Sequence, residues 1–105
     1  MAQIVLDGPS TLNALGVDTL TALESWLTSL DANQSIRAVI LTGAGRAFCV
    51  GADLNRLGTD HERTMAAANS LIQAIRAMDV PLIAAVNGLA VGYGASLVAT
   101  ADLAI

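Results

Sequence analysis

The apolar residues of the first thirty positions form a short extended run followed by a helical pattern. Residues 3–6 read Gln-Ile-Val-Leu, a strand-like run that is closed by the turn residues Asp-Gly-Pro-Ser. From Asp18 onward, apolar side chains recur at steps of three and four, at Leu20, Leu23, Trp26, Leu27 and Leu30. This spacing predicts an amphipathic helix, and Thr21 and Glu24 have the spacing of a capping box near its start. We expect Trp26 to pack in the core beside the leucines.

A further strand, a loop and a second helix are predicted between residues 38 and 80. Residues 38–41 read Ala-Val-Ile-Leu, a buried strand that stops at Thr-Gly-Ala-Gly. Residues 46–63 mix glycine, aspartate, asparagine and arginine, which predicts a loop with one helical turn around residues 53–57. A second amphipathic pattern follows, with Met65, Ala68, Leu71, Ile72, Ile75 and Met78 on one side. Pro81 ends this helix, because the residue before a proline favours extended backbone.

The last quarter of the chain continues the alternation. Residues 82–86 predict a strand, Asn87-Gly88 a turn, residues 94–101 a short helix, and residues 103–105 the start of another strand. Alternating strands and helices are typical of an α/β fold whose parallel strands are joined by crossovers. No repeat or linker divides the sequence, so we expect one domain over residues 1–105. Because the chain opens on one strand and stops inside another, we expect this domain to be truncated at both ends.

Composition excludes several classes of protein. The 105 residues are 54% hydrophobic and 13% charged, which is too apolar for a disordered chain. The absence of lysine excludes a P-loop and a Schiff-base mechanism, and the scattered arginines predict no nucleic-acid partner. Cys49 is the only cysteine, which excludes an internal disulfide and a cysteine zinc site and fits a reducing cytoplasm. The first sixteen residues lack a signal-peptide pattern.

Two glycine-containing segments directly follow apolar strands and are the candidates for chemistry. Residues 45–54 read Gly-Arg-Ala-Phe-Cys-Val-Gly-Ala-Asp-Leu, and residues 85–96 read Ala-Val-Asn-Gly-Leu-Ala-Val-Gly-Tyr-Gly-Ala-Ser. Glycine lets the backbone approach a ligand closely and adopt positive φ, so that N–H groups can point into a cavity. Two N–H groups that converge on one point form an oxyanion hole. Spacing alone does not distinguish this function from that of ordinary turns.

The same two segments strongly resemble the two most characteristic segments of the crotonase family, which comprises the enoyl-CoA hydratases and isomerases. The resemblance covers residues 38–54 and 81–104, and Leu12-Asn13-Ala14-Leu15 resembles an early turn of the family. It implies an α/β fold, the N-terminal portion of a crotonase-like ββα superhelix. It also implies acyl-CoA thioester substrates and, for a full-length protein, a homotrimer or a hexamer. Coenzyme A would enter only as part of the substrate, with no separate cofactor and no metal.

The resemblance also implies which residues form the site. The backbone N–H groups of Ala52 and Tyr93 would form the oxyanion hole, which stabilises a thioester enolate. Tyr93 stands in the place of the middle glycine of the family's Gly-Gly-Gly run, and a backbone donor does not depend on its side chain. Ala14, Asp53 and Leu54 would line the path of the CoA moiety, together with the two oxyanion residues.

One position departs from the family pattern. In the hydratases a catalytic glutamate stands two residues after the third glycine of the run, and this chain has Ser96 there. A serine hydroxyl is no general base for water at neutral pH, and the family's second acidic position would lie beyond Ile105. Two-glutamate hydration is therefore disfavoured, and a double-bond isomerase with one acid/base group from the later segment is at least as compatible. We expect this chain alone to lack the acid/base residue.

Other interpretations stay open beside an acyl-CoA enzyme. A non-catalytic crotonase-like fragment that acts in assembly would need no acid/base group. Residues 80–101 carry no formal charge over a length that could span a bilayer, but Pro81 interrupts a helix there, so a membrane anchor is the remoter alternative. We expect Cys49 to be a small buried residue, His61 to lie in a solvated loop, and Glu62 to be at most a substitute base.

Overall fold

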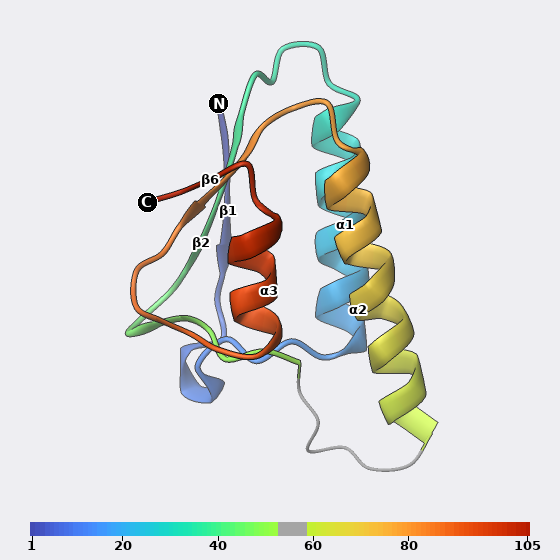
Figure 1. Cartoon of the computed structure of the whole chain (residues 1–105), viewed down its shortest axis with the longest axis vertical. Helices are drawn as coiled ribbons and strands as arrows, with labels where there is room; N and C mark the ends of the chain where they lie inside the picture. The colour runs from blue at the N-terminus through green and yellow to red at the C-terminus, as the bar shows by residue number, and fades with distance from the viewer. Residues whose placement is uncertain (53–58) are drawn as a thin grey trace.

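The structure is a computed structural model that describes residues 1–52 and 59–105. In this described part, a parallel sheet has the strand order β1-β2-β4-β6, and a second parallel pair joins β3 and β5. The strands are β1 (Ala2–Leu6), β2 (Val39–Gly43), β3 (Ala47–Cys49), β4 (Leu82–Ala85), β5 (Leu89–Ala90) and β6 (Leu103–Ala104). The helices are η1 (Pro9–Thr11), a 3₁₀ turn, and α1 (Val17–Asp31), α2 (Thr59–Ala77) and α3 (Tyr93–Thr100). The three α-helices lie on one side of the longer sheet (Figure 1).

The elements follow one another as long strand, short strand and helix. β2, β3 and α2 form one such unit, and β4, β5 and α3 form the next. Each crossover returns the chain to a neighbouring parallel strand, with Val39 of β2 beside Ala2 of β1 and beside Leu82 of β4. The predicted α/β order with parallel crossovers is therefore confirmed, and the repeated ββα unit is the arrangement that the crotonase resemblance implies.

The hydrophobic core lies between the longer sheet and the helices. It is formed by the inner faces of the strands and by one stripe of each helix, including Leu20, Leu23, Leu27, Val39, Leu41, Leu71, Ile75, Leu82, Ala84 and Leu97. Full burial of a leucine contributes about 1.5–3 kcal/mol relative to an exposed one. This packing holds the helices on the sheet and fixes where each strand ends.

Two predictions for α1 are wrong. The helix begins at Val17, one residue before the expected Asp18, and its N-cap is Gly16, which makes no side-chain cap hydrogen bond with the described residues. Thr21 and Glu24 therefore lie inside the helix and form no capping box. Trp26 is 63% exposed instead of packing in the core. The buried stripe of α1 runs through Leu20, Leu23 and Leu27, and Trp26 falls beside it, over the edge strand β1.

The predicted loop over residues 46–63 is also corrected. Residues 47–49 form β3, and α2 already begins at Thr59, so His61 is an exposed helix residue rather than a loop residue. The helical turn expected around residues 53–57 lies outside the described residues. The pairing of β3 with β5 was not predicted, because strands this short carry no periodic pattern of apolar residues.

The uncharged segment 80–101 is divided between two kinds of structure. Residues 82–85 form β4, which pairs with β2 and β6, and α3 covers only the later part of the segment. The expectation of a strand at 82–86 is confirmed over Leu82–Ala85, and Val86 continues the contact by donating its N–H to the Ile105 carbonyl at 2.8 Å. Within the described residues, no helix has both the length and the apolarity needed to cross a membrane.

Candidate functional site

The two glycine-containing segments lie side by side. The second sheet joins them directly, since Ala47 pairs with Leu89 and Cys49 pairs with Ala90. The Val91 N–H then donates to the Cys49 carbonyl at 3.2 Å. Segments separated by about forty residues in the sequence thus meet at one end of the longer sheet, where β2 and β4 stop.

Gly51 lies against the Tyr93 backbone, next to the predicted oxyanion residue Ala52. Gly51 has a φ of +109°, and a Cβ placed on it would lie 3.1 Å from the Tyr93 nitrogen and 3.6 Å from the Tyr93 Cβ. Ala52 follows Gly51 directly, so its N–H lies in the same neighbourhood as that of Tyr93. Within residues 1–52 and 59–105, neither N–H donates to a protein acceptor. That both point into one cavity stays a prediction.

The buried side chain of Asn13 is hydrogen-bonded to the first glycine-containing segment, residues 45–54, and to the residue before it. It is 2% exposed and has a φ of +61°, which asparagine tolerates better than most residues. Its side-chain nitrogen donates to the carbonyls of Ala44 at 3.0 Å, Ala47 at 3.0 Å and Phe48 at 3.1 Å. Its side-chain oxygen accepts the Gly8 N–H at 2.8 Å. The amide is therefore fully used, and the turn around residues 12–15 is tied to the strand that leads into the site.

The same turn pairs with the backbone around Gly51. The Leu15 N–H donates to the Gly51 carbonyl at 2.9 Å, and the Val50 N–H donates to the Leu12 carbonyl at 3.2 Å. Leu15 forms an isolated parallel bridge with Ala52. Ala14, predicted to line the CoA path, is half-buried in this turn next to the bridge. Asp53 and Leu54, the other predicted lining residues, lie outside the described residues.

Asn87 links the two segments at their exposed side. Its side-chain nitrogen donates to the carbonyls of Gly45 and Ala47, each at 3.0 Å, and its side-chain oxygen accepts the Gly43 N–H at 3.1 Å. The sequence suggested only a turn at Asn87-Gly88. The sequence did not predict that Asn87 bridges the two segments, because the carbonyls that it contacts are distant in the sequence and come close only through the crossover.

Glycine is required where α3 docks on β3. A Cβ on Gly94 would lie 2.0 Å from the Cys49 carbonyl oxygen, and one on Gly88 would lie 2.1 Å from the Arg46 carbonyl oxygen. Both neighbours are backbone atoms, which cannot move aside as a flexible side chain can. These two glycines therefore let the second segment lie directly against the first.

The side chain of Tyr93 extends to α2. Its hydroxyl donates to the Ala68 carbonyl at 2.6 Å. Burial raises the pKa of the phenol, and the nearby Cys49 and Glu24 raise it further. The hydroxyl is therefore a protonated donor at neutral pH.

Cys49 is fully buried, as predicted, and is not a reactive nucleophile. Burial raises the pKa of its thiol, and the hydrogen bond from Gly51 offsets part of this rise. The sulfur donates to the Asn13 carbonyl at 3.2 Å and accepts the Gly51 N–H at 3.3 Å. Cys49 thus fixes the peptide that precedes the Ala52 N–H.

Ser96 and Glu62, the candidate acid/base positions among the described residues, are both exposed. Ser96 is exposed in the first half of α3, where its N–H donates to the Gly92 carbonyl at 3.2 Å. Glu62 is exposed on α2, six residues before Ala68, which is about 9 Å along a helix axis. Among the described residues, no group of three or more histidine, cysteine, aspartate and glutamate side chains could hold a metal ion.

The predicted chemistry of this pair is the binding of a polarised carbonyl. Two backbone N–H groups that face one oxygen and are fixed by the surrounding hydrogen bonds can stabilise negative charge on it without reorganising. Moving a proton would additionally require an acid/base group beside that oxygen.

Comparison with known proteins identifies the family. The model of the enoyl-CoA hydratase/isomerase family matches residues 1–105. YngF of Bacillus subtilis is 41% identical, over all of this chain and 42% of its own length. An enoyl-CoA hydratase from Mycobacterium smegmatis superposes with a TM-score of 0.89 at 36% identity, over 97% of this chain and 42% of that one.

A monofunctional enoyl-CoA isomerase from M. smegmatis is similar as well, with a TM-score of 0.81 and 34% identity over 97% of this chain and 43% of that one. The chain thus spans about two fifths of the length of the relatives that it matches. The fold of this part is shared by relatives named for hydration and for isomerisation. The chain belongs to the enoyl-CoA hydratase/isomerase family.

Proposed function

We propose that this chain forms the thioester-binding part of an acyl-CoA enzyme, with the N–H groups of Ala52 and Tyr93 as its oxyanion hole. The observation that carries the proposal is the contact of Gly51 with the Tyr93 backbone, which brings the two donors into one neighbourhood. A thioester carbonyl withdraws charge from its α-carbon, so an enolate oxygen forms as a proton leaves that carbon or as water adds. Each donor directed at this oxygen would contribute about 2.7–4 kcal/mol to lowering the barrier.

The reaction class within the family follows from the acid/base groups. Ser96 stands where the hydratases have their first glutamate, and its hydroxyl cannot act as a base for water at neutral pH. We favour double-bond isomerisation of an enoyl-CoA, which needs one acid/base group, over two-glutamate hydration. In a longer protein, that group would come from sequence outside these 105 residues. Ala14, Asp53 and Leu54 are proposed to contact the CoA moiety.

The test compares two ligands that differ only at the carbonyl. Butyryl-CoA has the thioester oxygen, and S-butyl-CoA is the thioether that lacks it. Two new hydrogen bonds of about 0.5–1.5 kcal/mol each predict that calorimetry gives a dissociation constant for the thioester about tenfold lower. Equal affinities would exclude the oxyanion hole. Binding of neither ligand would favour the non-catalytic assembly function instead.

A further inference from the structure

The hydrogen bond from the Tyr93 hydroxyl to α2 has no function in the proposed oxyanion hole, which uses only the backbone N–H of Tyr93. The family pattern has a glycine at this position, and a glycine could make no such contact. Here the phenol hydroxyl reaches 25 residues back to the Ala68 carbonyl at 2.6 Å, and the half-buried ring packs against the core. Ala68 is itself 2% exposed in the middle of α2, so the acceptor is fixed in position.

The other contacts that hold the start of α3 are backbone contacts with β3, such as the bond from the Val91 N–H to the Cys49 carbonyl. Its N-cap Gly92 has a φ of +55° and makes no side-chain cap hydrogen bond with the described residues. α3 has eight residues, and a helix this short is unstable without tertiary contacts. Gly94 rests on the Cys49 carbonyl from one side, and the Tyr93 phenol holds the same turn from the other.

We propose that Tyr93 is a positioning residue: its hydroxyl clamps the first turn of α3 to α2 and thereby orients the Tyr93 N–H beside Gly51. For its effect on a thioester, this inference rests on the proposed function. The raised pKa of the phenol keeps the hydroxyl protonated, so the clamp persists at neutral pH. The aromatic ring packs against the core, and the hydroxyl orients the first turn of α3.

The first experiment tests the clamp without any ligand. Tyr93→Phe keeps the ring and removes the hydrogen bond. Thr100→Val is the matched control, because it removes the 2.7 Å bond from the Thr100 hydroxyl to the Ser96 carbonyl in the last turn of the same helix.

We expect hydrogen exchange of the Gly94 amide, which bonds the Val91 carbonyl, to be about fivefold faster in Tyr93→Phe, as for a loss of about 1 kcal/mol. The Ala101 amide should stay unchanged in Tyr93→Phe, and the Gly94 amide should stay unchanged in Thr100→Val. Unchanged Gly94 exchange in Tyr93→Phe would overturn the clamp.

The second experiment tests what the clamp does for a thioester. Butyryl-CoA labelled with ¹³C at the carbonyl is bound to the wild-type chain, and we expect a downfield shift of the carbonyl signal from the hydrogen bonds. Tyr93→Phe should lose at least half of this shift while Thr100→Val retains it. A full shift in saturated Tyr93→Phe would show that the hydroxyl does not position the donor, and would overturn the inference. No shift in the bound wild-type chain would instead refute the oxyanion hole, whatever the exchange experiment shows about the clamp.

Discussion

Asn13 illustrates what single residues contribute to this site. The sequence placed it in a turn that resembles the crotonase family, but it did not reveal the three carbonyls that the side chain contacts. Those carbonyls lie more than thirty residues away and approach only when β2 and β3 have formed. Cys49, by contrast, was predictable as a buried residue from its apolar neighbours alone.

Asn13→Asp should destabilise the fold strongly. Aspartate keeps the shape and tolerates positive φ, but it puts an oxygen where the amide donates, against three carbonyls. We expect the free energy of unfolding to fall by about 3 kcal/mol or more, measured by urea unfolding followed by circular dichroism. Asn33→Asp is the control, since the exposed side chain of Asn33 accepts the Ser35 N–H at 2.9 Å and a carboxylate can do the same. Equal losses in the two variants would show that the Asn13 donors do not stabilise the site.

Stability should also fall in alkali because of two buried groups. Burial raises the pKa values of Cys49 and Tyr93 above their ordinary 9.0 and 10.0. Above those values the unfolded chain releases protons that the folded chain retains, so stability present below about pH 9 is lost as the pH rises. We expect the free energy of unfolding to be lower at about pH 10.5 than at about pH 8, and the difference to be smaller in a Cys49→Ala, Tyr93→Phe double variant. An unchanged difference would assign the alkaline loss to other groups.

At the scale of elements, the periodic segments were predictable and the short ones were not. The stripes of α1 and α2 and the apolar runs of β2 and β4 follow from sequence periodicity. β3 and β5 have three and two residues and form only because the crossovers bring them together. The burial of Trp26 was predicted wrongly because helical spacing does not show which residues at the border of an apolar stripe are covered by the sheet.

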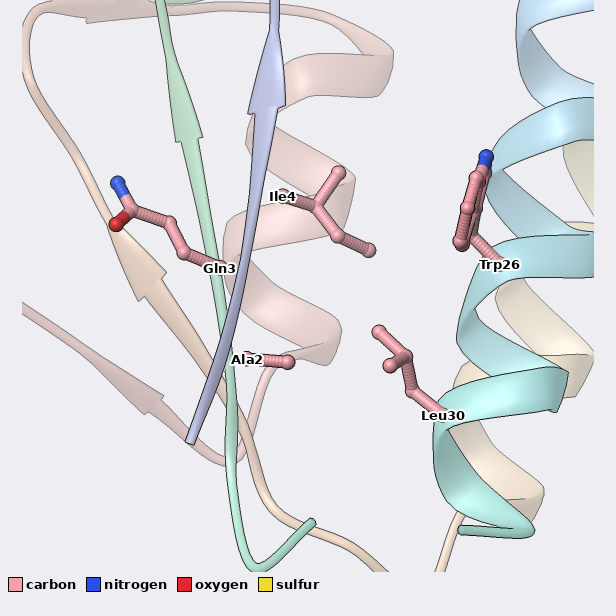
Figure 2. Close-up of a pocket in the computed structure, with 5 residues that line it drawn as sticks. All are labelled: Ala2, Gln3, Ile4, Trp26 and Leu30. Atoms are coloured by element: carbon pink, nitrogen blue, oxygen red, sulfur yellow. The ribbon is translucent and has the colours of Figure 1, made fainter.

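Trp26 instead lines an open apolar cavity of about 250 Å³ with Ala2, Gln3, Ile4 and Leu30, between α1 and the edge strand β1 (Figure 2). In the described part of the chain, no strand pairs with the outer side of β1. The cavity therefore lies beside the buried stripe of α1, at the unpaired edge of the sheet.

Gly94→Ala tests how α3 docks on β3. The added Cβ would lie 2.0 Å from the Cys49 carbonyl oxygen, so α3 must shift outward and weaken the Val91 bond to the same carbonyl. We expect a loss of about 1–3 kcal/mol in the free energy of unfolding and changed backbone chemical shifts over residues 89–94. Gly8→Ala is the control, because its nearest neighbour is the Thr11 hydroxyl at 3.6 Å, an ordinary contact. Should both variants unfold at the same urea concentration, the close approach would not matter.

At the scale of the whole molecule, the chain has the fold of the enoyl-CoA hydratase/isomerase family over part of the length of its relatives. It spans about two fifths of the length of its relatives, and Ser96 replaces the first glutamate of the hydratases. The family could be identified from the sequence, because its motifs lie on the loops that form the site. The reaction could not, because the sequence does not identify the acid/base group that would move the proton.

We therefore predict negligible enoyl-CoA hydratase activity for the 105-residue chain. The assay follows the loss of conjugated enoyl absorbance with crotonyl-CoA, and a full-length hydratase of the family is the positive control. Turnover in the usual range of roughly 1–1000 per second would contradict the prediction. Glu62→Gln and Asp53→Asn would then identify the acid/base group.

The central claim is that the Ala52 and Tyr93 N–H groups donate to one thioester oxygen. An ¹⁵N-labelled chain titrated with butyryl-CoA and, separately, with S-butyl-CoA tests it directly by amide chemical shifts. We predict that the proton signals of both amides move downfield with the thioester, as two hydrogen bonds form to the same oxygen, and stay in place with the thioether. Identical shifts with the two ligands, or shifts elsewhere that leave Ala52 and Tyr93 unmoved, would contradict the account.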